Sequence, residues 1–155
     1  MNTLRIAPDT APAQFISLHD SRVTGIHYSD DSITFEFDDG FDRIEDDQLH
    51  HVGTGAVTFE GCTIDDFFCY KIRCKPGKNG LRLRGREINI KDLDHRFFAE
   101  NKYIEVFTEL YSENHMFWRG ALYPQSKLML SKSTHYIVFE TMGRFPMIFT
   151  WKEIS

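Results

Sequence analysis

The stretch His19–Asp47 reads HDSRVTGIHYSDDSITFEFDDGFDRIEDD, and its pattern decides the fold class. Ile33, Phe35 and Phe37 alternate with polar residues, a period of two that predicts a strand with one buried and one solvated face. Arg22 to Tyr28 predicts the strand before it, and the intervening SDDS is typical of a turn. The stretch therefore predicts an antiparallel β-hairpin, the usual arrangement when one face of a sheet is wet.

Two glycines refine this hairpin. The apolar alternation slips between Val23 and Ile26, and Gly25 at the slip predicts a β-bulge. Asp39 and Gly40 predict a second turn, because glycine adopts positive φ without steric cost.

Short alternating runs separated by Gly and Pro continue through the rest of the chain. One run predicts an inward row of side chains: Phe68, Tyr70, Ile72 and Cys74. Leu128 and Leu130 predict another strand, and Phe145 to Trp151 the last one. Because Pro146 cannot donate to a ladder, this last strand is expected at a sheet edge or with Pro146 on an unpaired side. A single short helix is expected over residues 92–100, with Asp92 as its N-cap. We expect a mainly β protein: an antiparallel β-sandwich or partly open barrel of about ten short strands with one short helix.

A chain of 155 residues is expected to form one domain. Residues 1–14 contain two prolines and no periodicity, so they predict a flexible N-terminal arm before a single β domain over 15–155. The three cysteines, Cys62, Cys69 and Cys74, have no zinc-finger spacing and are expected to be reduced, with Cys74 buried.

Composition narrows the class of protein. The first residues lack an apolar leader and no run has the roughly 18 apolar residues of a membrane helix, so we expect a cytoplasmic protein without membrane contact. A net charge of −5 and a pI near 5.8 argue against broad nucleic-acid binding. Monomer and homodimer both remain open.

Charge is distributed unevenly. Residues 30–47 hold nine acidic side chains and one basic one, whereas residues 71–96 hold nine basic and three acidic ones. Such runs are commonly solvated faces, but an acidic surface that docks a basic protein partner is the sharper interpretation. Its predicted partner-binding residues are Asp30, Asp31, Asp38, Asp39, Asp42, Glu45, Asp46 and Asp47. The basic stripe of Lys78, Arg82, Arg84 and Arg86 fits either a wet sheet face or a phosphate contact.

Sites for chemistry are weakly indicated. His50 and His51 follow Asp46 and Asp47, but a metal needs three or four converging ligands, and a polar loop is the plainer interpretation. An oxygen-ligand calcium site among Asp38, Asp39 and Asp42 lacks the spacing of known calcium loops. His19 and Asp20 diverge in a regular strand, so Asp20 is expected to accept turn N–H groups and pair with Arg22. We expect no catalytic residue, no metal and no cofactor.

Several local patterns occur together: LHDSRVT over 18–24, Asp39-Gly40-Phe41, Phe117-Trp118-Arg119-Gly120 and a terminal aromatic strand closing on Trp151. In these the chain resembles small β-rich bacterial proteins of uncharacterised function, some of which look like immunity-type proteins that neutralise polymorphic toxins. The resemblance implies a binding role and carries over no catalytic residue.

The leading hypothesis is a non-enzymatic binding protein, immunity-like, that presents the acidic hairpin surface to a basic protein. The alternative is a small-ligand-binding β domain with a cleft lined by aromatics such as Phe107, Tyr111 and Tyr123. A hydrolase-like enzyme using His19/Asp20 or His50/His51 is the third class considered.

Overall fold

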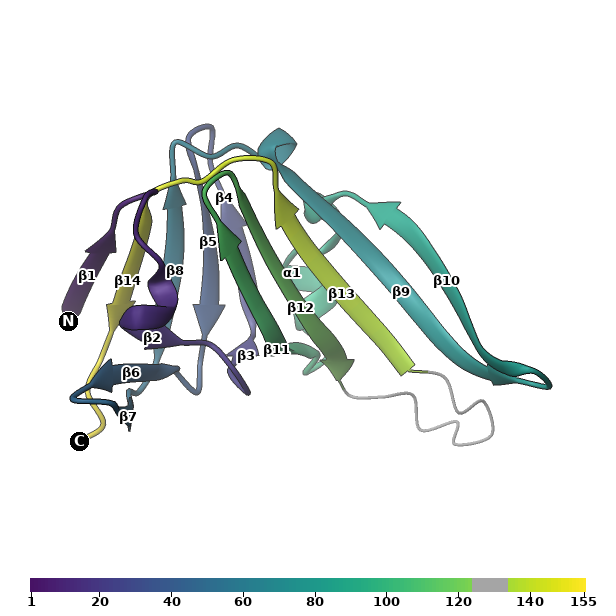
Figure 1. Cartoon of the computed structure of the whole chain (residues 1–155), viewed down its shortest axis with the longest axis horizontal. Coiled ribbons are helices and arrows are strands. Elements are labelled where there is room, and N and C mark those ends of the chain that lie inside the picture. The colour runs from purple at the N-terminus through teal and green to yellow at the C-terminus, as the bar shows by residue number, and fades with distance from the viewer. Residues whose placement is uncertain (124–133) are drawn as a thin grey trace.

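The computed structural model of the protein describes residues 1–123 and 134–155, and within them three antiparallel sheets form a β-sandwich (Figure 1). A five-stranded sheet has the order β1 (Asn2–Ile6), β14 (Met147–Trp151), β8 (Gly55–Glu60), β5 (Ser32–Phe37) and β4 (Gly25–Tyr28). A six-stranded sheet has the order β10 (Gly80–Ile88), β9 (Phe67–Gly77), β13 (Thr134–Thr141), β12 (His115–Tyr123), β11 (Tyr103–Ser112) and β3 (Arg22–Val23). A small sheet has the order β2 (Ile16–Ser17), β6 (Asp42–Glu45) and β7 (Gln48–His51). The predicted mainly β, antiparallel sandwich is confirmed, and the described strands close no barrel.

Aromatic rings join the two large sheets. Phe35 on β5 is fully buried, and its ring centroid lies 5.2 Å from that of Trp118 on β12 and 5.1 Å from that of Phe139 on β13. Both pairs meet edge to face, a geometry that adds about 0.5–1.5 kcal/mol per pair beyond burial. The alternation of Ile33, Phe35 and Phe37 therefore predicts these core residues correctly, since all three are fully buried.

The predicted bulge at Gly25 is instead a change of sheet. Val23 pairs with Ile104 in the six-stranded sheet, whereas Gly25 pairs with Glu36 in the five-stranded sheet. The chain crosses between the sheets at Thr24, so the apolar side chains before and after the crossing both reach the core without an inserted residue. The predicted hairpin therefore forms only from Gly25 onward, where β4 pairs with β5. Arg22 and Val23 pair with β11 instead.

The predicted flexible arm over residues 1–14 is wrong for much of its length. Asn2–Ile6 form β1, which pairs with Met147–Trp151 of β14, and Pro12–Gln14 form a 3-10 helix. Backbone pairing with a strand distant in sequence supplies the order that local composition lacks. The same pairing corrects the edge position predicted for the last strand: β14 lies between β1 and β8, and Pro146 precedes its first residue.

The inward row predicted for β9 is inverted. Phe67 and Cys69 are buried against the core, whereas Phe68, Tyr70, Ile72 and Cys74 are only partly buried on the other face. Lys71, Arg73 and Lys75 continue the row of Phe67 and Cys69. Figure 1 shows the reason: β9 and β10 extend sideways past the strands of the five-stranded sheet, so the core-side face becomes a solvated face along their length.

The helical segment is shorter than predicted. The helix α1 spans His95–Phe98, within the predicted residues 92–100, and its N-cap is Asp94, whose Oδ1 accepts from the backbone N–H of Arg96 (2.9 Å). Asp92 instead closes a 3-10 turn, Ile90–Asp92, that Asn89 caps. The predicted strand at Leu128 and Leu130 lies outside the described residues. No helix among the described residues has the length and apolar character to cross a membrane.

All three cysteines are free thiols. Cys62 and Cys69 are buried, and burial raises the pKa of each thiol to about 12. Cys74 is only partly buried because it lies on the outer face of β9, so the prediction that it is buried is wrong.

Candidate functional site

The eight predicted partner-binding carboxylates do not form one surface. Asp30 and Asp31 lie in the turn before β5, and Asp38 and Asp39 follow its other end, with six strand residues between them. At roughly 3.4 Å per residue the strand separates the two pairs by about 20 Å. Six carboxylates remain at one end of the sandwich, and we call them the acidic end: Asp38, Asp39, Asp42, Glu45, Asp46 and Asp47.

A tight hairpin carries four of the six carboxylates of the acidic end. β6 pairs with β7 in register from Asp42–His51 to Glu45–Gln48, and Asp46 and Asp47 form the two-residue turn. Both turn residues have positive φ, at 50° and 59°, the pattern of a type I′ turn that aspartate tolerates. The polar loop predicted at His50 and His51 is therefore wrong, because both residues lie in β7. Because His50 and His51 occupy consecutive strand positions, their side chains leave opposite faces.

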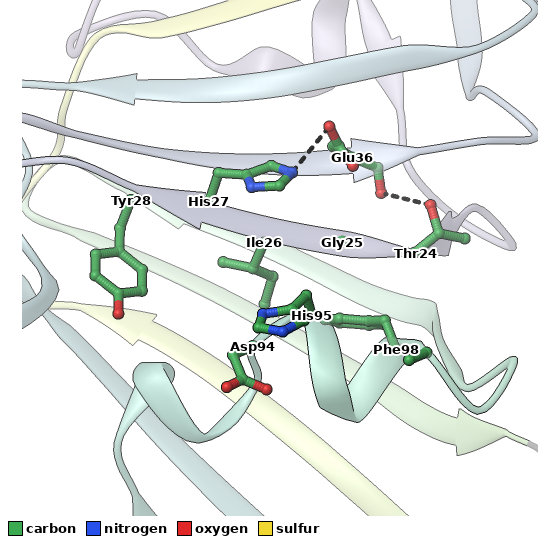
Figure 2. Close-up of a pocket in the computed structure, with 10 residues that line it drawn as sticks. Thr24, Gly25, Ile26, His27, Tyr28, Glu36, Asp94, His95 and Phe98 are labelled. Atoms are coloured by element: carbon green, nitrogen blue, oxygen red, sulfur yellow. Dashed lines mark hydrogen bonds and ion pairs between the residues drawn. The ribbon is translucent and has the colours of Figure 1, made fainter.

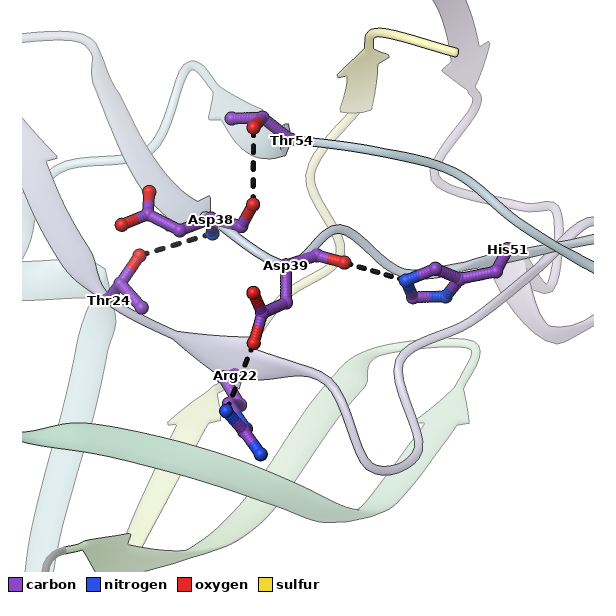
Figure 3. Close-up of polar contacts among 6 residues, drawn as sticks. All are labelled: Arg22, Thr24, Asp38, Asp39, His51 and Thr54. Carbon is purple, nitrogen blue, oxygen red and sulfur yellow. Dashed lines mark hydrogen bonds and ion pairs between the residues drawn. The ribbon is translucent and has the colours of Figure 1, made fainter. Parts of the chain in front are cut away.

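His51 ties this hairpin to the end of β5 (Figure 3). Its Nδ1 lies 2.8 Å from Asp42 Oδ1. Its Nε2 lies 2.7 Å from the backbone oxygen of Asp39, the contact that Figure 3 draws. The Asp39 carboxylate in turn accepts from Arg22 Nη1 at 3.1 Å. These contacts fix the positions of two of the six carboxylates relative to the sandwich.

Asp38 is held through its backbone alone. Its N–H donates to Thr24 Oγ1 at 3.2 Å, and its carbonyl accepts from Thr54 Oγ1 at 3.1 Å (Figure 3). Its carboxylate, like those of Asp46 and Asp47, makes no hydrogen bond or ion pair within the described residues. Three carboxylates of the acidic end are thus available to an outside cation.

Asp38 also borders a hollow on the outer face of the five-stranded sheet. The hollow has a volume of about 250 Å³, and Glu36, Thr54, Trp151 and Lys152 are among the residues that line it. Two carboxylates therefore face a space large enough for one basic side chain. Sequence alternation puts Glu36 and Asp38 on the same face of β5, but Glu36 was not among the predicted partner-binding residues.

A larger hollow lies between the edge strand β4 and helix α1 (Figure 2). Its volume is about 470 Å³, and its polar lining includes His27, Glu36 and His95. His27 Nε2 lies 3.0 Å from Glu36 Oε1, while Asp94, also in the lining, is occupied by capping α1. No local sequence signal joins β4 to α1, so this hollow was not predicted.

The other candidate groups do not assemble into a reaction centre. His19 Nδ1 lies 3.0 Å from Asp20 Oδ2, because Asp20 adopts a left-handed conformation (φ 64°), so the predicted divergence and the predicted Asp20–Arg22 pair are both wrong. Both side chains are more than 60% exposed, a setting that leaves the pair in water. Among the described residues no three His, Cys, Asp or Glu side chains converge to hold a metal ion.

The aromatic residues predicted to line a ligand cleft do not share one. Tyr111 is engaged in a buried chain in which Trp118 Nε1 donates to the Tyr111 hydroxyl (2.8 Å) and that hydroxyl donates to Glu109 (2.9 Å). Tyr123 stacks on Tyr103 across the strand pair, with 5.3 Å between ring centroids. Burial raises the pKa of the Glu109 carboxyl, although hydrogen bonds from Leu18 and Tyr111 oppose the shift. The Tyr111 hydroxyl is thus occupied by hydrogen bonds within the protein.

No protein-family model matches this chain, and no curated protein or solved structure gives a significant match. The argument about function therefore depends on the geometry of the described residues.

Proposed function

We propose that the protein is a non-enzymatic binding module that docks a basic protein partner on its acidic end. The observation that carries the proposal is the set of three carboxylates without internal partners, Asp38, Asp46 and Asp47, on a frame fixed by His51. The hollow beside Asp38 and Glu36 gives a lysine or arginine of the partner a place to enter. An immunity-type protein that neutralises a basic toxin would be one instance of this role.

Charge at such a surface acts mainly on association rate and on the choice of partner. Asp39, Asp42 and Glu45 are already paired with Arg22, His51 and Arg43, so they contribute less attraction than their number suggests. The proposal therefore narrows the docking residues to Asp38, Asp46 and Asp47, since Glu36 in the hollow is itself paired with His27. Asp30 and Asp31 lie too far away to contact the same small patch.

The test compares two variants that each remove three charges. Asp38→Asn, Asp46→Asn and Asp47→Asn remove the unpaired carboxylates, and asparagine also tolerates the left-handed turn positions. The matched control, Asp30→Asn, Asp31→Asn and Asp65→Asn, removes three charges near the other end of β5. The tagged wild type and the two tagged variants are each captured from the protein's own host at low salt and analysed by native mass spectrometry.

We expect a stoichiometric basic polypeptide with the wild type and the control but not with the acidic-end variant. Equal capture by both variants would exclude the acidic end, and an acidic polypeptide would contradict the proposed partner chemistry.

A small-ligand role is the second candidate, and the hollow between β4 and α1 is the observation that favours it. Its volume falls in the range of about 300–1,000 Å³ typical of ligand sites, and His27, Glu36 and His95 supply polar contacts. A thermal-shift panel of metabolites and sugars tests this role. A ligand that stabilises the wild type but not a His95→Ala variant would identify the site.

A further inference from the structure

The second charged region of the molecule is the β9–β10 hairpin, and its cations are concentrated on one face. The antiparallel register places Lys71 opposite Arg86, Arg73 opposite Arg84, and Lys75 opposite Arg82. Residues opposite one another in a sheet project to the same side, so these six side chains form three rungs of like charge. We call them the basic face. Lys71 is partly buried, and the other five are exposed.

Of the described carboxylates, none forms an ion pair with Lys71, Lys75, Arg82, Arg84 or Arg86. Residues 124–133, PQSKLMLSKS, contain two lysines and no acidic residue. Like charges directly opposite each other destabilise a strand pair, so the hairpin retains a repulsion that an anion would relieve.

The surroundings of the basic face suit phosphate oxygens. Lys71, Arg73, Arg84, Arg86 and His135 line a hollow of about 320 Å³, and Arg73, Lys75, Arg82 and Arg84 line a second of about 200 Å³. His135 Nδ1 is buried without a hydrogen-bond partner in the structure. Four of the six cations are arginines, whose planar guanidinium groups bind phosphate in a bidentate manner.

The shape of the hairpin distinguishes among phosphate-bearing partners. The last described residue of β13 that pairs with β9 is Thr134, opposite Cys74, and the hairpin continues beyond it to its turn (Figure 1). Only the rung of Lys75 and Arg82 lies beyond this point, because Lys71 and Arg73 pair across β9 with Ile137 and His135 of β13. The basic face therefore covers the edge of the six-stranded sheet, where its three rungs span about 14 Å, a length over which a duplex presents about eight phosphates. Single-stranded nucleic acid binds through aromatic stacking platforms, whereas the two hollows of the basic face are lined without Phe, Tyr or Trp.

We propose that the basic face of the β9–β10 hairpin binds the phosphate backbone of a nucleic-acid duplex. The chain's net charge of −5 conceals this face, because the acidic residues are concentrated elsewhere. Figure 1 shows β6 and β7 at the opposite end of the longest axis from the β9–β10 turn, so the acidic end does not screen the approach of a polyanion. The site is independent of the protein-docking surface proposed above.

The test measures binding of the full chain to a short fluorescein-labelled DNA duplex by anisotropy between about 50 and 200 mM salt. If five or six cations contact phosphates, log K falls with log salt with a slope of about −4.5 to −5.4. The variant Arg82→Gln, Arg84→Gln, Arg86→Gln should bind at least about ten-fold more weakly at the low-salt end, with a slope smaller by about 3. Circular dichroism confirms that the variant is folded.

The matched control removes three cations away from this face: Arg5→Gln, Arg119→Gln and Lys152→Gln. It should retain the affinity and slope of the wild type. Absence of duplex binding, or equal loss in both variants, would overturn the proposal. So would equal binding of polyglutamate, or binding of phosphatidylserine vesicles without binding of the duplex, since these outcomes would identify a general anion contact or a membrane surface instead.

Discussion

The acidic end and the basic face differ in how the fold treats their charges. Three of the six carboxylates of the acidic end are paired internally, and His51 and Arg22 hold their frame in place. On the basic face, cations oppose cations across three rungs, and no ion pair to a described carboxylate is formed by five of the six. Charged side chains packed beside other elements of the sandwich form internal ion pairs that hold those elements together. Charged side chains on a projecting hairpin can remain without such pairs and available to a ligand.

The largest expected effect concerns the packing beneath the acidic end. Gly40 has φ +77°, and a Cβ there would lie 2.1 Å from the carbonyl oxygen of Gly53 and 2.2 Å from that of Val52. Gly40→Ala should lower the free energy of unfolding by about 3–5 kcal/mol, combining the left-handed penalty with overpacking against backbone. Urea denaturation measures the loss. Gly61→Ala is the matched control, because Gly61 has φ +69° with no atom within 4 Å of the added Cβ, and it should cost only about 1–2 kcal/mol. Equal losses would show that close packing does not define this end.

His51 should contribute more to the free energy of unfolding than His50, its neighbour in β7. His51→Ala removes both ring contacts, to Asp42 and to the Asp39 carbonyl, and should cost about 1 kcal/mol because the side chain is partly exposed. His50→Ala changes a side chain on the opposite face and should stay within about 0.5 kcal/mol. The urea denaturation midpoints of the two variants measure these losses of stability. A larger loss for His50→Ala would contradict the role assigned to His51.

Removing charged side chains should change the free energy of unfolding in opposite directions at the two regions. Arg82→Gln, Arg84→Gln and Arg86→Gln together should raise the free energy of unfolding by a few tenths of a kcal/mol at low salt, because they relieve the repulsion across the rungs. Arg22→Gln should lower it by a similar amount through loss of the pair with Asp39. At about 1 M salt, where the Debye length is about 3 Å, both effects should shrink. Destabilisation of the hairpin variant would mean that its cations are compensated after all.

The smallest effect is a pH dependence near the basic face. Burial, and secondarily the charges of Lys71 and Arg73, lower the pKa of the His135 imidazole below its usual 6.5. Between the lowered pKa and 6.5 the unfolded chain binds more protons than the folded one, so His135 makes stability fall as pH drops through that window. NMR titration of the ring gives the pKa directly. Lys71→Gln should move it upward and a bound duplex should move it further, whereas a titration at or above 6.5 in the free protein would contradict the assigned surroundings.

Sequence patterns predicted local structure well where pairing partners are neighbours. The strand through Ile33, Phe35 and Phe37 and the turn at Gly40 follow from alternation and from the positive φ that glycine allows. The sheet change at Thr24 could not be predicted, since both sheets bury the same kind of side chain. The strand Asn2–Ile6 was missed because its partner, β14, lies at the other end of the chain.

The candidate sites were predicted less completely than the strands. The acidic run indicated six carboxylates that do share one end, but sequence distance did not show that β5 separates Asp30 and Asp31 from them. Half of the basic face, Arg82, Arg84 and Arg86, was predicted as a basic stripe. Its other half, Lys71, Arg73 and Lys75, was not assigned to that stripe, because these residues occupy the same row as the buried Phe67 and Cys69. Alternation alone cannot tell where the opposing sheet ends and a core-side row becomes a binding surface.

NMR mapping with two probes distinguishes two separate binding surfaces from a single one. Amide spectra of the full chain are recorded during titration with a short DNA duplex and, separately, with an oligolysine peptide. The duplex should shift residues of β9 and β10 around Arg84, while oligolysine should shift those around Asp38, Asp46 and Asp47. Shifts of one common set by both probes, or no specific shift with either, would contradict the existence of two separate surfaces.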